Sequence, residues 1–306
     1  MAFGVHAQEQ LWSQRAERNL SAKQIFREVQ LSTNVLDARF RQSTGKLTLE
    51  LPLPDGTSAD FVLTPSSVMA PELAAKFPEI KTYNAVSRDG KMSAKVDYNG
   101  TAFYAMVRTP HGLVYLDPND RQKPELYHSY YVKEYKDHKK APLFEEGEID
   151  FSMKQVWIKK PAPKQENRVN TTLGGELRTY RIAIAANSEF SQFHGGTITS
   201  VLSAIVTTMN RVNSVYENDL SITMQLIADN DQIIFTNAST DPYRNANTPG
   251  DFLDINASVI DHIISADSYD IGHIFSTSSG GVAALGSVCT RNKAAGPTGL
   301  GSPIGD

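Results

Sequence analysis

The residues best suited to metal chemistry in this chain are its histidines. They are His6, His111, His128, His138, His194, His262 and His273. A catalytic zinc ion needs three protein ligands and an open position for water, and two histidines four residues apart share one helix face. None of these histidines has a second one four residues away, and none belongs to a His-Glu-x-x-His sequence. The sequence therefore predicts no catalytic residue and no metal ligand within this chain.

Two single residues remain open to more than one interpretation. His273 lies inside the apolar run Ile271-Gly-His-Ile-Phe275. It is either a core or edge histidine whose ring is hydrogen-bonded within the protein, or a metal ligand. Cys289 is the only cysteine, so no disulfide can form within the chain. A buried, unreactive thiol and a thiol whose partner lies elsewhere are both compatible with this sequence.

One run of small residues has the composition of a backbone contact site. It consists of Gly281, Val282, Ala283, Ala284, Leu285 and Gly286. Glycine and alanine let another backbone approach closely. The run therefore suits either a tightly packed interior strand or an edge strand to which an extended peptide adds.

Composition narrows the class of protein. The chain has 306 residues, so we expect two domains. Charged residues make up 21% and hydrophobic residues 40%, which is typical of a soluble globular protein. The net charge of -4 gives no sign of nucleic-acid binding. No apolar run approaches the ~18 residues of a membrane span.

The second part of the chain, residues 177–306, has the rhythm of an α/β domain. Strands are predicted at Tyr180–Ala186, Leu220–Ala228, Ile271–Phe275 and Val282–Cys289. A helix is predicted from Ile198, with apolar residues at three-and-four spacing as far as Tyr216, and a second helix from Phe252 to Ile264. This order favours a largely parallel sheet flanked by helices.

The first part, residues 8–135, reads as mostly antiparallel β. The candidate strands are residues 45–52, 60–63, 91–98, 101–108 and 111–117. Turns are predicted at Pro54–Gly56, Asp89–Gly90, Pro110–Gly112 and Asp117–Asp120. Asn99-Gly100, between two alternating runs, is the strongest hairpin signal.

Residues 136–176 form a predicted linker between the two parts. Lys159-Lys-Pro-Ala-Pro-Lys-Gln-Glu-Asn-Arg168 is polar, rich in proline and without periodicity. It suits a plain tether or a processing site. At the start, Met1-Ala-Phe-Gly-Val-His-Ala7 resembles the last part of a secretory signal peptide, with an ordinary disordered start as the alternative. The first interpretation implies a secreted protein.

Four segments of the second part carry a family resemblance. They are Tyr180-Arg-Ile-Ala-Ile-Ala-Ala-Asn187, Met209-Asn-Arg-Val-Asn-Ser-Val-Tyr-Glu217, Asp270-Ile-Gly-His-Ile-Phe275 and Gly280-Gly-Val-Ala-Ala-Leu-Gly-Ser-Val-Cys289. Together they resemble the upstream half of a reprolysin-like metzincin, a zinc metalloprotease. The tail Lys293–Asp306 is similar to the secreted bacterial branch, which is built as precursor, catalytic domain and sorting domain.

The resemblance implies a peptidase function whose zinc-binding helix is not expected within these 306 residues. It implies a secreted zinc endopeptidase in precursor form, with a β-rich prodomain packed on an α/β catalytic domain and with peptide or protein substrates. The zinc helix is expected roughly ten residues beyond Asp306. Zinc is therefore expected in the full-length protein and not in this chain. In the family, the strand matched by Gly281–Gly286 binds substrate, and the cysteine matched by Cys289 pairs with one beyond the zinc helix.

Two departures from the family pattern limit the resemblance. A structural calcium ion in this family uses a glutamate on the first strand, but the matching residue is Arg181, which cannot bind a cation. No thiol precedes Cys289 to silence the zinc ion. Phe144-Glu-Glu-Gly-Glu148 offers carboxylates instead, although a solvated acidic patch is the plain alternative. The competing function is a noncatalytic extracellular binding or adhesion module.

Overall fold

The computed structural model describes most of the chain outside its ends and the junction between the two predicted parts. The described residues are 10–14, 26–42, 46–120, 123–134, 176–278 and 280–303. The chain divides into two compact units. Unit 1 contains Met1–Lys136, Leu202–Ser214 and Gly305–Asp306, and unit 2 contains Asp137–Val201 and Val215–Ile304. The predicted signal remnant, the acidic run at 144–148 and all but the last residue of the predicted linker lie outside the described residues.

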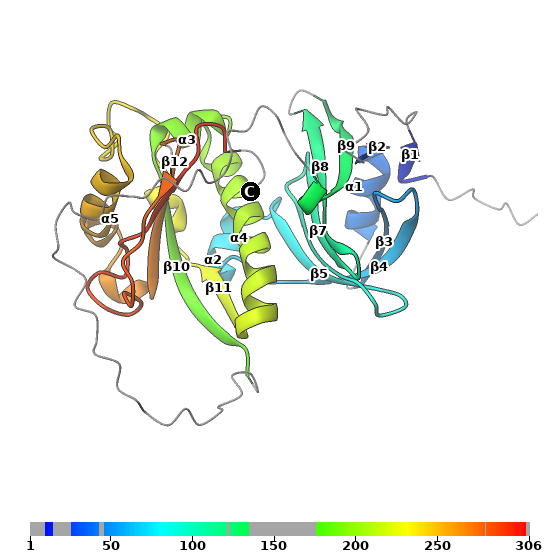
Figure 1. The fold of residues 1–306 in the computed structure, drawn as a ribbon. Helices are drawn as coiled ribbons and strands as arrows, with labels where there is room; N and C mark the ends of the chain where they lie inside the picture. Colours follow the sequence, from blue (N-terminus) through cyan, green and yellow to red (C-terminus); the bar gives the residue numbers. More distant parts are fainter. Residues whose placement is uncertain are drawn as a thin grey trace, which may run out of the picture. The chain divides into compact units, whose positions relative to one another are not determined.

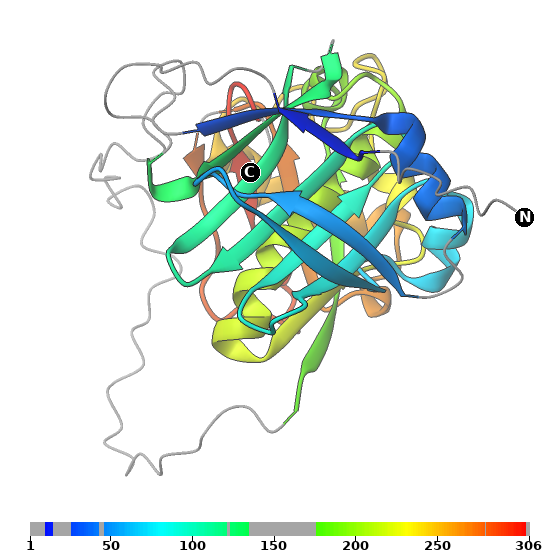
Figure 2. The ribbon, with the colours of Figure 1, turned by 90° about the vertical axis from the view of Figure 1, so that its right-hand side faces the viewer.

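Unit 1 is built on one antiparallel sheet of nine strands in the order β1-β2-β9-β8-β7-β6-β5-β4-β3. The strands are β1 (Trp12–Gln14), β2 (Phe26–Leu31), β3 (Leu47–Pro52), β4 (Ser58–Pro65), β5 (Lys81–Ser87), β6 (Ser93–Tyr98), β7 (Phe103–Thr109), β8 (Gly112–Asp120) and β9 (Lys123–Tyr131). Figure 2 looks onto this sheet, whose long central strands lie side by side. The prediction of a mostly antiparallel first part is confirmed.

The sheet curves until its first strand reaches its last. The Trp12 indole N–H on β1 donates to the Glu50 carbonyl on β3 at 2.7 Å, and the Ser129 hydroxyl on β9 donates to the Pro52 carbonyl at 2.8 Å. Helix α1 (Thr33–Gln42) contributes Leu36 and Phe40 to the apolar core of this unit. A short helix, α2 (Pro71–Lys76), connects β4 and β5.

The tight turns of unit 1 follow the predicted turn chemistry. Asn99 and Gly100 connect β6 to β7, and the Asn99 carboxamide oxygen accepts from the Thr101 and Ala102 amides at 3.0 and 2.7 Å. Gly100 has a φ of 87°, which glycine adopts without the steric cost of a side chain. The strongest hairpin prediction is therefore confirmed.

The predicted turn at Asp117–Asp120 is wrong. These residues belong to β8, and the pairing of β8 with β9 shifts register between Pro118 and Asp120. A β-bulge accommodates proline inside a strand, so the Asp-Pro-Asn-Asp composition does not end this strand. The strands β1, β2, β5 and β9 and the helices α1 and α2 were not predicted, since none shows a long, regular alternation of polar and apolar residues.

Unit 2 contains a five-stranded sheet in the order β11-β10-β12-β14-β13. The strands are β10 (Arg178–Ala186), β11 (Ile222–Leu226), β12 (Ile271–Ser276), β13 (Gly280–Gly281) and β14 (Pro297–Gly299). All neighbouring pairs are parallel except β13 with β14, so the prediction of a largely parallel sheet is confirmed. Helix α5 (Pro249–Ile263) lies beside β12 (Figure 1). Its Phe252 and Ile260 belong to an apolar cluster with Ala183 and Ile274 of the sheet.

Helix α4 (Ile198–Leu220) is the longest helix among the described residues, and the short helix α3 (Ser188–Phe193) lies between β10 and α4 in the chain. The first turn of α4 is closed by a capping box, in which the Thr197 hydroxyl accepts from the Ser200 amide and the Ser200 side chain accepts from the Thr197 amide. The helix ends at Ser221, whose φ of 54° is left-handed. Its ends belong to unit 2, whereas residues 202–214 belong to unit 1.

Two predicted strands of unit 2 have different limits. The run Leu220–Ala228 contributes a strand only from Ile222 to Leu226, because Leu220 still belongs to α4. The run Val282–Cys289 was predicted as a strand, but strand pairing is regular only at Gly280–Gly281 and the residues that follow form loops and turns. Among the described residues, no helix is long and apolar enough to cross a membrane.

Candidate functional site

The run Gly281–Gly286 lies at the outer edge of the unit 2 sheet. β13 is the last strand in the described order, next to β14. Beyond β13, the Val282 amide donates to the Pro297 carbonyl at 3.2 Å and the Ala284 amide donates to the Ala295 carbonyl at 2.9 Å. The Val282 and Ala284 amides are therefore bonded toward the β14 side, and the alternation of an extended chain turns the Ala283 amide outward, whereas Leu285 already lies in a turn.

Exposure along this edge follows the same alternation. Gly281, Ala283 and Leu285 are exposed, and Val282 and Ala284 are partly buried. Leu285 is 99% exposed, although leucine is ordinarily buried. Gly286 ends the run with a φ of 67°. An added peptide strand would bond to an outward amide such as that of Ala283 and would contact an exposed apolar side chain such as that of Leu285. The substrate role of this run stays a prediction.

Cys289 is exposed, which contradicts the alternative of a buried thiol. Its φ is 59°, and its amide donates to the Asp270 carbonyl at 3.2 Å. The Asp270 carboxylate in turn holds the Arg181 guanidinium, with Nη2 to Oδ1 at 2.7 Å and Nε to Oδ2 at 3.2 Å. This hydrogen-bonded pair lowers the pKa of Asp270 and raises the pKa of Arg181. The disulfide of Cys289 stays a prediction.

His273 has the role of a neutral structural histidine. Its Nε2 lies 2.8 Å from the Thr298 hydroxyl on β14. Burial lowers the pKa of His273 to about 4, so the ring is neutral near pH 7. Gly296 stands close to the ring, since a Cβ at this position would lie 2.8 Å from Nδ1. This environment accounts for a histidine in an apolar strand without a metal ligand role.

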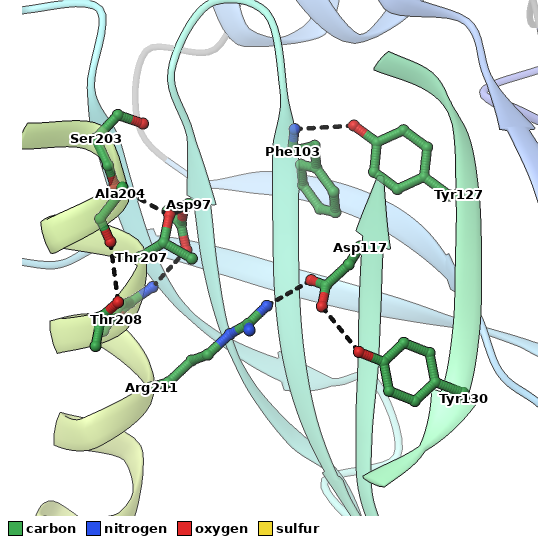
Figure 3. A network of polar contacts seen from close by, with 11 residues as sticks. Asp97, Phe103, Asp117, Tyr127, Tyr130, Ser203, Ala204, Thr207, Thr208 and Arg211 are labelled. Atoms are coloured by element: carbon green, nitrogen blue, oxygen red, sulfur yellow. Dashed lines mark hydrogen bonds and ion pairs between the residues drawn. The ribbon is translucent and has the colours of Figure 1, made fainter. Parts of the chain in front are cut away.

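A cluster of buried polar groups among the described residues was not predicted from the sequence. It forms in unit 1 between strands β6 to β9 and the middle of helix α4 (Figure 3). Asp97 on β6 accepts from the Thr207 hydroxyl at 2.5 Å and from the Asn210 amide group at 3.3 Å. Asp97, Thr207 and Asn210 are all at most 5% exposed. A buried carboxylate requires such donors, because an unpaired charge is costly away from water.

Arg211 occupies the centre of this cluster. Its guanidinium forms an ion pair with Asp117 on β8 and lies over the Tyr115 ring, with Cζ 4.2 Å from the ring centroid. The Tyr130 hydroxyl on β9 donates to the second Asp117 oxygen at 3.2 Å. Arg211 is only 4% exposed. The three ionisable groups Asp97, Asp117 and Arg211 thus bring two acids and one base into a buried space.

Burial and charge act on Asp97 and Arg211 in opposite directions. Burial raises the pKa of Asp97 to about 6, although Thr207, Arg211 and Asn210 oppose this shift. Burial is the largest single effect on Arg211 and disfavours its charged form, but the contributions of Asp117, Tyr115, Asp97 and Tyr130 together outweigh it, and the pKa of Arg211 is raised. Arg211 is therefore always charged, and Asp97 titrates near pH 6.

A sequence signal for this cluster does exist. Ser203, Thr207, Asn210, Arg211 and Ser214 recur at spacings that place them on one face of a helix. The polar face of an amphipathic helix is normally exposed to water, so this pattern predicts a solvated face and not a buried cluster. Asp97 likewise lies in a strand whose alternation is regular. Only the fold brings the strands and the helix together.

The described residues do not fit a catalytic zinc ion. Within these parts of the chain, no three side chains of His, Cys, Asp or Glu lie close enough together to hold a metal. The polar cluster in unit 1 contains only two carboxylates and a guanidinium, and a cation between them would displace Arg211. We therefore derive no catalytic step from these residues.

Comparison with known proteins gives a match to the second part of the chain. No curated protein matches this chain. Residues 176–304, which include both α4 and the edge run, match the model of the metallo-peptidase family M12B, reprolysin-like. This match, together with the parallel sheet and its antiparallel edge strand, supports a reprolysin-like metallopeptidase as the class of residues 176–304.

Proposed function

We propose that the protein is the precursor of a secreted, zinc-dependent endopeptidase of reprolysin type. The match of residues 176–304 to the reprolysin-like metallopeptidase family carries this proposal. Peptide-bond hydrolysis by a metal-activated water is the chemistry that zinc supplies in such enzymes. The bacterial origin and the secreted location rest on the resemblance of the chain's two ends to secreted bacterial precursors.

In this proposal the β-rich part is a prodomain. It packs on the peptidase part and leaves when the segment at 136–176 is cut. One observation supports it: residues 202–214 of a helix inside the family match are grouped with the β-rich unit 1. The departures at Arg181 and Cys289 leave neither a calcium site nor a thiol upstream of Cys289 for latency.

The proposed substrates are peptides or proteins in extended form. They add to the edge run Gly281–Gly286 through the outward amide of Ala283. The small side chains on both sides of Val282 leave room for a second backbone. The edge therefore positions a substrate strand, whereas the residues that cleave it are not among those described.

The coding sequence that follows the codon of Asp306 is the direct test. A His-Glu-x-x-His-x-x-Gly-x-x-His sequence within the next twenty or so codons supports the proposal, and a stop codon directly after Asp306 contradicts it. Metal analysis is an independent check. The present chain should contain no stoichiometric zinc, and a chain that includes the zinc helix should bind about one zinc ion per molecule.

A further inference from the structure

The polar stripe of helix α4 is buried although its composition suits water. The stripe consists of Ser203, Thr207, Asn210, Arg211 and Ser214. Asn210 is 0% exposed and Arg211 is 4% exposed. Apolar residues of the same helix, such as Leu202 and Ile205, are also fully buried. A surface helix ordinarily buries only its apolar stripe, so the burial of the polar stripe needs a separate explanation.

The sheet offers polar partners along the whole length of the stripe, although Asn210 Oδ1 and Arg211 Nη1 have none among the described residues. The Asn99 side-chain carboxamide donates to the Ser203 hydroxyl at 2.7 Å, and the Arg108 guanidinium donates to the Ser214 backbone carbonyl at 3.3 Å. Between these two ends lie the Asp97 and Asp117 contacts with Thr207, Asn210 and Arg211, shown in Figure 3. The matched groups extend over about three turns of helix, which fixes both its position and its rotation on the sheet.

Such a contact differs in kind from the core of unit 1. That core is formed by aliphatic and aromatic side chains such as Leu49, Phe61 and Phe103. A buried ion pair contributes little net stability compared with apolar residues of the same volume, but removal of one partner is costly. Polar, charge-matched contacts are therefore better suited to selecting one partner than to holding a fold together.

We propose that the sheet face carrying Asp97, Asn99, Arg108 and Asp117 is a docking surface for the polar stripe of α4, built so that the helix can leave it. On separation the stripe returns serine, threonine, asparagine and arginine to water, which solvates these groups well. The sheet face likewise returns two carboxylates and a guanidinium to water. The partner is a helix with this stripe, here the one inside the reprolysin-like segment.

The proposal rests on the proposed function only for the reason that the helix should leave, namely release of a precursor part. Docking itself needs neither zinc nor peptidase activity. A failure of docking therefore leaves the metallopeptidase assignment untouched. Conversely, a stop codon after Asp306 would remove the reason for release but would not alter the binding measurement.

The test uses the whole 306-residue chain, cut once between its two parts. A specific protease site replaces Lys159–Arg168, and the purified chain is cut at pH 7.5 in 150 mM salt. Analytical ultracentrifugation over a dilution series then gives the dissociation constant of the two fragments. The wild-type fragments should stay together. Asp117→Asn should raise the dissociation constant at least about tenfold, because it leaves Arg211 buried without its ion-pair partner.

Asp60→Asn is the matched control. It is the same change on the same sheet, but Asp60 pairs with Arg88 at 3.3 Å on the surface, with 49% of the Asp60 side chain exposed. The dissociation constant of this variant should change less than about twofold. Wild-type fragments that separate at once, or an Asp117→Asn effect no larger than that of Asp60→Asn, would overturn the proposal.

Hydrogen exchange in the uncut chain decides the matter if the fragments precipitate or a variant fails to survive cutting. In Asp117→Asn, amides of residues 203–214 should exchange at least about tenfold faster than in the wild type, since the helix leaves the sheet more often. Amides of Ile182–Ala186 should be unchanged, and Asp60→Asn should match the wild type in both segments. Equal exchange of residues 203–214 in all three proteins would contradict the proposal.

Discussion

Asp97 sets the charge of the buried polar cluster. With Asp97 ionised, Asp97, Asp117 and Arg211 sum to one negative charge, and protonation of Asp97 makes the cluster neutral. Burial raises the pKa of Asp97 from 3.8 to about 6. The folded state therefore binds this proton more tightly than the unfolded state does, so Asp97 favours folding at low pH.

The stability of unit 1 should consequently fall as the pH rises from about 4 to 7. The contribution of Asp97 is complete below its ordinary pKa and is lost as the pH passes the folded value, which amounts to about 3 kcal/mol. Asp97→Asn should remove this loss, because the carboxamide cannot ionise. Urea unfolding between pH 4.5 and 8 measures the effect, and a carboxyl ¹³C titration should place the midpoint near pH 6. A midpoint near pH 4 would show that the buried site does not favour the neutral acid.

Cys289 gives a second prediction at this scale. Because its side chain is exposed, the native chain should react with about one equivalent of a thiol reagent without denaturant. The time course of reaction with dithionitrobenzoate measures this. Reaction only after addition of guanidinium would mean that the thiol is covered in solution.

At the scale of elements, the edge run contains two adjacent alanines whose backbone amides have different environments, although the sequence does not distinguish them. The Ala284 amide is bonded within the sheet, whereas the Ala283 amide faces outward. The family resemblance predicted that this run holds substrate, but neither the resemblance nor the composition could determine which amides are available. That distinction depends on the partner strand, and β14 lies more than ten residues further along the chain.

In a longer form of the chain that cleaves peptides, as proposed, Ala283→Pro should raise KM for a peptide substrate about tenfold or more, because it removes an outward donor. Ala284→Pro should instead disturb the bond to Ala295 and lower the thermal midpoint of unit 2. Steady-state kinetics and circular dichroism distinguish the two outcomes. Unchanged kinetics in Ala283→Pro, with the fold intact, would exclude a substrate role for this edge.

The elements that sequence reasoning found are those with strong local signals. β10, β12, α4 and α5 have regular periodicity, and the Asn99-Gly100 hairpin has turn chemistry that fixes its geometry. The strand β8 was ended too early, because Pro118 and its polar neighbours indicate a turn unless a bulge absorbs them. The polar cluster could not be predicted, since Asp117 and Arg211 are 94 positions apart and only the folding of the helix onto the sheet connects them.

At the scale of the whole molecule, the segment between the two predicted parts should be the first to be cut. Limited proteolysis with trypsin should cleave between Lys159 and Gly175, because the sequence there is polar, rich in proline and without periodicity. Mass spectrometry should find a C-terminal fragment that begins near Leu177. A first cut inside α4 would contradict this prediction, since that helix carries buried side chains along its length.

The membership of residues 202–214 in unit 1 also has a consequence for the order in which the protein folds during its synthesis. Asp97 and Asp117 leave the ribosome well before Arg211, which follows Asp117 by 94 residues. At about 5–20 residues per second, this gap lasts roughly 5–20 seconds. Throughout that time the charged groups Asp97, Arg108 and Asp117 of the newly formed sheet are solvated by water, because the helix that covers them has not yet been made.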